Sequence, residues 1–276
     1  TGEIVNSDRS NSGGLVGAFF AGSSSNSYWD INQSGANTSG TGTGLNTTEM
    51  IDTATTSMNL DFGNTWTSTD HYYPKLQWQN IGSGSNVDPY MLENCHQLQF
   101  MNQSLTSSYQ LSNDIDCSQT EKWNNGKGYE PVGDSSSKFD GDLFGKDHSI
   151  EYLQSKRASE DFVGLFGDLG DGGGEDSKIY NFTFENVEIE GDYTVGGIAG
   201  RSSYADINAV RVDGNITGTG IFGGIVGNNA VPAEIMKSAA NVSISGSSSS
   251  GGIAGWNDGL IQNTYVSGEG VNGGYQ

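Results

Sequence analysis

The pentapeptide Gly-Gly-Ile-Ala-Gly at residues 196–200 decides the fold, because close variants of it recur along the chain. It returns as Gly-Gly-Ile-Val-Gly at 223–227, Gly-Gly-Ile-Ala-Gly at 251–255 and Gly-Gly-Leu-Val-Gly at 13–17, with Val-Gly-Leu-Phe-Gly at 163–167. The second glycines of neighbouring copies, Gly197, Gly224 and Gly252, are 27 and 28 residues apart. A repeat of this length indicates a solenoid or a tandem array. An apolar pair between glycines is typical of a short buried strand between tight corners, where glycine permits positive φ and close backbone approach.

Each repeat from residue 162 onward contains two further strand-like segments. One begins at Ile179, Ile207, Ile235 or Leu260, and the other alternates apolar and polar residues at 187–191, 210–214, 242–246 and 265–268. Alternation with period two places Val and Ile on one face of a strand and polar residues on the other. Three short strands per repeat of roughly 22–33 residues predict an all-β fold, a right-handed, three-sided parallel β-helix. A β-propeller is the second choice, but its blades need about 40 residues.

The order of segments predicts two solenoids in succession. Residues 1–79 are expected to be the last rungs and closing cap of a first β-helix, and 80–88, rich in Gly, Ser and Asn, to be a linker. Residues 89–276 are expected to be the opening cap and rungs of a second. Two short helices are predicted in the caps. One starts at Asp88 as N-cap with Pro89 first, and the other has Thr47 or Thr48 as N-cap.

The chain is strongly acidic. Its 276 residues include 12 Lys+Arg and 33 Asp+Glu, for a formal net charge of −21. This charge argues against nucleic-acid binding and against an anionic membrane surface, and no apolar run is long enough for membrane insertion. The negative charge favours an extracellular or cell-surface protein. The combination of few lysines with many acidic residues suggests a protein from a high-salt habitat.

The glycine blocks resemble the GLUG motif, which occurs in tandem in large secreted and surface proteins of bacteria and archaea. Leu165-Phe166-Gly167 and Leu15-Val16-Gly17 match it well, and the other copies replace Leu by Ile. Residues 90–167 resemble the region that often precedes such repeats, and residues 28–78 the segment that often follows them. The resemblance implies a β-helical scaffold, and since a closing segment precedes an opening one, we expect the chain to be one period of a longer array.

Two functional classes follow. The first is a non-enzymatic structural or adhesive module of a repetitive surface or filament-forming protein, whose partners are neighbouring copies in end-to-end association, surface glycans or other cells. The alternative is a carbohydrate-binding or carbohydrate-cleaving β-helix of tailspike or lyase type, using exposed aromatics such as Trp256 or Tyr204. A trimeric fibre is a third arrangement.

No residue is assigned a catalytic role. The carboxylate pairs Asp114/Asp116 and Asp140/Asp142 have the residue type that glycosidases use. The alternative, which we favour, is that they cap turns and coil corners. Neither a His-Glu-x-x-His sequence nor a Gly-x-Ser-x-Gly elbow with a plausible triad is present.

No cofactor is expected apart from calcium. Residues 168–176 combine four acids with four glycines, and a flexible, oxygen-rich loop suits Ca²⁺. The candidate ligands are Asp168, Asp171, Glu175 and Asp176; the alternative is a solvated acidic turn.

Two kinds of covalent modification are expected. Cys95 and Cys117, 22 residues apart, could lie on adjacent rungs as a disulfide, or remain two buried thiols. Seven Asn-x-Ser/Thr sequons offer N-glycosylation sites in a secreted protein. They are Asn32, Asn37, Asn46, Asn102, Asn181, Asn215 and Asn241.

Overall fold

The chain divides into two compact units, Thr1–Asn80 and Ile81–Gln276, which are described separately. The structure, a computed structural model, describes residues 13–18, 20–62, 65–68, 73–76, 82–170, 173, 176–246, 248–268 and 270–272. The division falls at the start of the linker predicted at 80–88. Residues 82–88 nevertheless belong to the second unit, because the amide of Ser108 donates to the carbonyl of Gly84 (2.8 Å).

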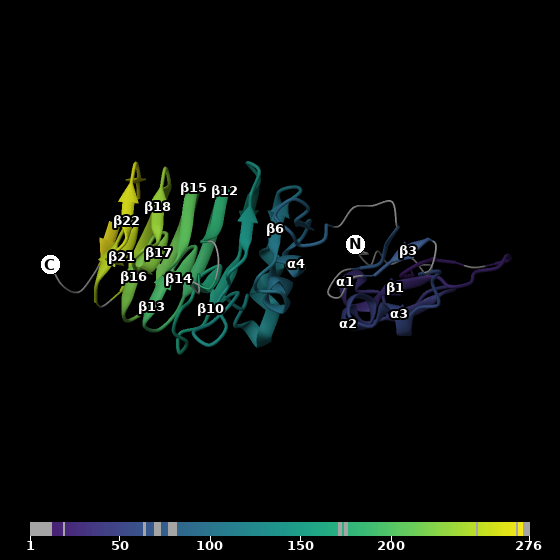
Figure 1. Ribbon diagram of the computed structural model, residues 1–276. Helices are drawn as coiled ribbons and strands as arrows, with labels where there is room; N and C mark the ends of the chain where they lie inside the picture. The colour runs from purple at the N-terminus through teal and green to yellow at the C-terminus, as the bar shows by residue number, and fades with distance from the viewer. Residues whose placement is uncertain are drawn as a thin grey trace. The chain divides into compact units, whose positions relative to one another are not determined.

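The first unit is a small assembly of short elements (Figure 1). Strands β1 and β2 pair in parallel and β3 and β4 antiparallel, and three helices of four or five residues surround a core of Leu45, Ala54 and Met58. The elements are β1 (Tyr28–Asp30), α1 (Ile31–Ser34), β2 (Thr43–Leu45), α2 (Thr47–Ile51), α3 (Ala54–Ser57), β3 (Trp66–Thr67) and β4 (Lys75–Leu76).

The N-cap of α2 is Asn46, so the predicted cap at Thr47 or Thr48 was wrong. The side chain of Asn46 accepts from the amide of Glu49 (2.8 Å), and the Glu49 carboxylate accepts from the amide of Asn46 (2.8 Å). This reciprocal capping box needs a Glu or Gln three residues after the cap, and only a cap at residue 46 provides it.

The helix predicted from residue 89 was also placed too early. Strand β5 (Tyr90–Leu92) pairs in parallel with β6 (Ser108–Leu111), and helix α4 (Cys95–Phe100) starts only after its N-cap Asn94. The apolar residues at i, i+3 spacing therefore include Leu92, which is in a strand. A strand partner 19 residues downstream outweighs the local helical pattern.

The second unit is built from parallel strands in three sheets (Figure 1). After α4 come a 3₁₀ turn, η1 (Met101–Gln103), and a 3₁₀ segment kinked at residues 123–125, η2 (Ser118–Gly126). The largest sheet contains β5, β6, β7 (Ile115–Asp116), β8 (Asp142–Phe144), β9 (Ser149–Glu151), β10 (Gln154–Lys156), β12 (Ser177–Glu190), β15 (Ala205–Thr217), β18 (Glu234–Met236), β19 (Ala239–Ser245), β22 (Leu260–Gln262), β23 (Tyr265–Val266) and β24 (Gly270–Asn272). The second contains β11 (Phe166–Leu169), β14 (Ala199–Ser202), β17 (Val226–Asn229) and β21 (Ala254–Asn257), and the third β13 (Thr194–Gly196), β16 (Ile221–Gly223) and β20 (Ser250–Gly251).

Equivalent positions of successive repeats are paired across these sheets. Ala199 pairs with Val226 and Val226 with Ala254, and Ile207 pairs with Ile235 and Ile235 with Ile261. Each repeat thus adds strands to the same sheets in the same order. Parallel pairing between repeats does not match the self-contained four-stranded blades of a propeller.

The alternating segments place their apolar side chains in one continuous core. Val210, Val212, Ile216, Val242 and Ile244 are buried, while the polar residues between them are more exposed. The second unit is therefore mostly β, with its strands in parallel sheets, as expected for an all-β fold. The right-handed, three-sided winding is a finer feature that stays a prediction.

Close backbone approach explains the glycines of the repeated block. None of the described block glycines has a positive φ. A Cβ on Gly223 would lie 1.9 Å from the carbonyl oxygen of Val226, and one on Gly224 would lie 2.1 Å from that of Gly252. The corner is therefore tight both within a repeat and between repeats, and the expected positive φ was wrong.

We expect Gly223→Ala to lower the free energy of unfolding by about 1–3 kcal/mol, the usual cost of overpacking. Urea unfolding followed by circular dichroism measures it. The control is Ser249→Ala, which removes an exposed hydroxyl in the adjacent repeat. Equal stability of the two variants would show that the corner has room for a methyl group.

Candidate functional site: an acidic groove beside helix α4

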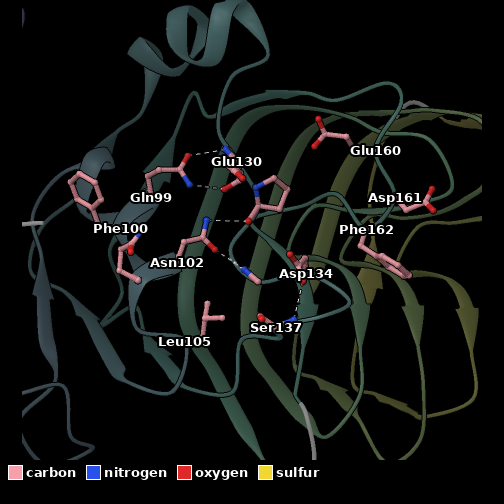
Figure 2. A pocket seen from close by; sticks show the side chains of 13 residues that line it. Gln99, Phe100, Asn102, Leu105, Glu130, Asp134, Ser137, Glu160, Asp161 and Phe162 are labelled. Carbon is pink, nitrogen blue, oxygen red and sulfur yellow. Dashed lines mark hydrogen bonds between the residues drawn. The ribbon is translucent and has the colours of Figure 1, made fainter. Parts of the chain in front are cut away.

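A groove of about 440 Å³ opens on the second unit beside α4 and η1. Figure 2 shows its wall of side chains from the α4–η1 segment, facing the loops at residues 130–137 and 160–162. The groove therefore lies where the first strands of the stack meet the helical segment.

Amide side chains fix the loop at 130–133 to the helical segment. Gln99 donates to the carbonyl of Glu130 (2.8 Å) and accepts from its amide (2.8 Å). Asn102 repeats the pattern, donating to the carbonyl of Pro131 (3.3 Å) and accepting from the amide of Gly133 (2.9 Å) (Figure 2). These paired bonds hold the loop against the helical segment and so shape one side of the groove.

The groove is lined by four carboxylates, on Glu130, Asp134, Glu160 and Asp161. Asp134 accepts from the amides of Ser136 (2.7 Å) and Ser137 (2.8 Å). Glu160 accepts from Lys127 Nζ (3.1 Å) and Arg157 Nη1 (2.8 Å). Glu130 and Asp161 are exposed and give the groove an acidic rim.

Opposing effects act on the Glu160 carboxyl. Burial raises its pKa, but the hydrogen bonds from Arg157 and Lys127 outweigh that effect, so the pKa of Glu160 lies below its ordinary value. A lowered pKa means that Glu160 is ionised at neutral pH. Its stabilising contribution is present above the ordinary carboxyl pKa and is lost as the pH falls through the lowered value.

Two buried side chains, Arg157 and Tyr129, bind backbone carbonyls next to the groove. Arg157 is only 6% exposed, and its Nε donates to the carbonyl of Tyr129 (2.8 Å). The Tyr129 hydroxyl donates to the carbonyl of Leu98 (3.3 Å), and burial, with the nearby charge of Glu130, raises the pKa of this phenol. Tyr129 is therefore a neutral structural side chain.

Phe162 lies at one side of the groove in an unusual backbone conformation. Its φ is +57°, which is rare for an aromatic residue. The guanidinium of Arg201 lies 5.0 Å from its ring centroid, a cation–π distance. Arg201 also binds both carboxylate oxygens of Asp168, through Nε to Oδ1 (3.1 Å) and through Nη2 to Oδ2.

Three of the four carboxylates weighed for catalysis, those of Asp114, Asp116 and Asp142, accept hydrogen bonds from backbone amides. Asp114 accepts from the amide of Ser149 (2.9 Å), and Asp116 from that of Ser118 (2.8 Å). Asp142 is buried and accepts from the amide of Lys178 (2.9 Å). This is the capping role that we favoured for these residues.

The structure places only part of the predicted calcium loop. Asp168 is fully buried and its carboxylate is already paired with the guanidinium of Arg201, whereas Asp176 is exposed. Asp171 and Glu175 lie outside the described residues. Among the residues that are described, no three His, Cys, Asp or Glu side chains are placed to hold one metal ion.

The sequons differ in exposure. Four asparagines are exposed: Asn32, Asn37, Asn46 and Asn215. The other three are half-buried: Asn102, Asn181 and Asn241. Of these, Asn102 belongs to the amide contacts above, and Asn241 donates to Asp213 (2.6 Å). The exposed sites are thus the more accessible to glycosylation.

Cys95 and Cys117 lie together as a disulfide with a Cα–Cα distance of 5.2 Å. It links α4 to the residue that precedes η2. The aromatics considered for carbohydrate binding, Tyr204 and Trp256, are exposed but lie away from the groove lining.

The amide contacts of the groove and the Asp168–Arg201 pair were not found from the sequence. The pair had a usable signal, because Asp168 and Arg201 each follow the last glycine of a block and are paired in register. The amide contacts join loops whose approach no repeat specifies.

Comparisons with known proteins give two relatives. The chain is 34% identical over 172 residues to Halomucin from Haloquadratum walsbyi, a match that covers 59% of this chain and 2% of that protein. It is 30% identical over 134 residues to a protein from Evansella cellulosilytica provisionally named a Gly-rich membrane protein, covering 48% of this chain and 15% of that one. The chain thus spans a small part of either relative. No family model matches it.

One solved structure is distantly similar. It is a protein from Bacteroides ovatus provisionally assigned as an immunoglobulin A1 protease, with 19% identity, a TM-score of 0.43, and coverage of 71% of this chain and 80% of that one. A likeness this low supports no statement about fold or activity here.

Proposed function

We propose that this chain is a non-enzymatic structural and adhesive module of a large, repetitive, extracellular or cell-surface protein, built as a right-handed, three-sided parallel β-helix of GLUG type. The observation that carries the proposal is the stacking of equivalent repeat positions in three sheets. Stacked repeats present long surfaces and extend by adding units, which suits a scaffold.

The relatives support a large surface protein. The match to Halomucin occupies 2% of that protein, and the second relative is named as a membrane protein. Within the described residues, no helix is long and apolar enough to cross a membrane. A net charge of −21 keeps such a surface hydrated and soluble.

Antibodies against the 276-residue chain test this proposal on cells of the source organism. Labelling of intact cells, abolished by external protease, is the expected result. Labelling that requires permeabilised cells would contradict a surface location.

Carbohydrate binding in the acidic groove is a second candidate. Phe100 and Phe162 line it together with carboxylates, a combination that can pack against sugar rings and accept hydrogen bonds from hydroxyls. A glycan array with Phe162→Ala as the comparison variant tests binding. Release of reducing sugar from any bound polysaccharide would overturn the non-enzymatic assignment.

Calcium remains a proposal for the loop that contains Asp171, Glu175 and Asp176. Binding to the folded chain would raise the melting temperature as calcium is added. An unchanged melting temperature up to millimolar calcium would rule the site out.

A further inference from the structure

A second groove, of about 650 Å³, lies on the largest sheet of the second unit, and we call it the sheet groove. Most of its lining comes from three strands that pair in succession, β12, β15 and β19, as residues 186–188, 213–215 and 241–243 (β12 and β15 in Figure 1). Tyr152 from the preceding repeat and Gly268 from the following one complete it. The groove therefore runs along the stack and crosses the strands.

The bottom of the sheet groove is formed by backbone. Val187 pairs with Gly214 and Gly214 with Val242; the two valine side chains are buried, and the glycine has none. Gly214 has a φ of +150°, and a Cβ there would lie 2.3 Å from the carbonyl oxygen of Val187. The residues on either side of this row point outward, because side chains alternate along a strand. Two rows of outward side chains therefore form the walls.

The walls are polar, and their carboxylates are already paired with cations. One row is Asn186, Asp213 and Asn241, and the other is Glu188, Asn215 and Ser243. Glu188 accepts from Lys156 Nζ (3.3 Å), and Asp213 accepts from Arg211 Nη2 (3.2 Å). Asn241 also donates to Asp213 (2.6 Å). Since each carboxylate has its own cation, the walls favour an uncharged ligand.

Three wall side chains are available for hydrogen bonds. Within the described residues, the side chains of Asn186, Asn215 and Ser243 have no hydrogen-bond partner in the protein. In the groove beside α4, by contrast, the amides of Gln99 and Asn102 bind backbone. A carboxamide and a hydroxyl each donate and accept, so the free groups of the sheet groove match the hydroxyls of a sugar.

Tyr152 places an aromatic ring at one end of the sheet groove. The residue is 50% exposed, and its φ of +60° is rare for an aromatic residue. Its amide donates to the carbonyl of Glu185 (2.9 Å), which holds this conformation against the next repeat. An exposed ring beside free amides can pack on the face of a sugar ring while the amides bind its hydroxyls.

We propose that the sheet groove binds a linear, uncharged glycan, with one sugar unit for each strand step and Tyr152 packed against the unit at one end. The strands are about 4.8 Å apart, close to the length of one hexose unit in an extended chain. From the repeat of Tyr152, through β12, β15 and β19, to that of Gly268 is four steps, which is about 19 Å or about four sugar units. The proposal rests on the adhesive function and names its ligand class.

An array of neutral and uronic-acid oligosaccharides of increasing length, followed by calorimetric titration of those that bind, tests the sheet groove. The whole chain is produced in a host that leaves the Asn215 sequon unmodified, since a glycan there would occupy the groove. Binding of a neutral series is expected, with an affinity that rises up to about four units and then levels off. The acidic series is expected not to bind.

Two variants and two matched controls assign the binding to this groove. Tyr152→Ala and Asn215→Ala should each weaken it about tenfold, through lost ring packing and an unpaired sugar hydroxyl. Tyr204→Ala and Asn263→Ala should bind as wild type. Tyr204 and Asn263 are also exposed and have φ values of +51° and +56°, but neither lines the groove. Circular dichroism checks that each variant is folded.

A chain that binds none of the neutral series would overturn the proposal, as would wild-type affinity in both Tyr152→Ala and Asn215→Ala. Binding that is lost in Phe162→Ala and kept in these two variants would place the glycan beside α4 and would also contradict the proposal. The readout is glycan binding alone, so its failure would leave the surface-labelling test of the scaffold function unaffected.

Discussion

Arg201→Met is expected to lower the free energy of unfolding by about 3–5 kcal/mol, the usual result of leaving one member of a buried ion pair without its partner. Asp168 is completely buried, and both of its carboxylate oxygens accept hydrogen bonds from Arg201. Without the guanidinium, an uncompensated negative charge would remain inside the stack. Guanidinium chloride unfolding of the variant and the wild type measures the difference.

The double variant Asp168→Leu/Arg201→Met is the matched control. Removing both charges replaces the pair by apolar groups, which is often neutral or even stabilising, so we expect it to recover most of the loss. Phe162→Leu isolates the ring contact of Arg201, for which about 0.5–1 kcal/mol is expected. If the double variant were as unstable as Arg201→Met, the loss would come from packing and not from the buried charge.

The second large effect is expected from the disulfide. Closing a loop between Cys95 and Cys117, 22 residues apart, corresponds to about 3 kcal/mol of stabilisation in the chain-entropy description. The double variant Cys95→Ala/Cys117→Ala should lose about this amount in urea unfolding. It should also become insensitive to reductant, whereas wild type should be destabilised by it.

The native chain provides a direct check of the same bond. Alkylation of unfolded, unreduced protein followed by intact mass measurement should add no label, and prior reduction should add two. Two labels without reduction would show that the cysteines are free thiols and would remove the basis for the stability difference.

The features predicted from the sequence are those that the repeat itself specifies. The spacing of the glycine blocks predicted that Ala199, Val226 and Ala254 occupy equivalent positions in successive repeats. The alternation of apolar and polar residues predicted which positions of the long strands are buried. Both follow from a local pattern applied many times. The predicted role of the block glycines was right for close backbone approach and wrong for positive φ. The close approach between repeats, as at Gly224 and Gly252, arises only when the repeats stack.

The features that were missed depend on contacts outside the repeat. Strand β5 forms because β6 lies beside it, and no local signal separates Leu92 from the helix that follows. The groove depends on Gln99 and Asn102 binding a loop 31 residues downstream. Such pairings between irregular segments are fixed by the whole fold and leave no periodic trace in the sequence.

One distance tests the stacked repeats most directly. Gln110 and Gln262 occupy matched positions five strand steps apart, through Phe144, Tyr180, Asn208 and Met236. At about 4.8 Å per step their Cα atoms should be about 24 Å apart, although 152 residues separate them. Spin labels at Gln110→Cys and Gln262→Cys, measured by pulsed dipolar EPR with the native disulfide intact, should give a narrow distribution centred between about 20 and 30 Å. A broad distribution, or one centred well beyond about 40 Å, would contradict the stacking of repeats on which the proposed function depends.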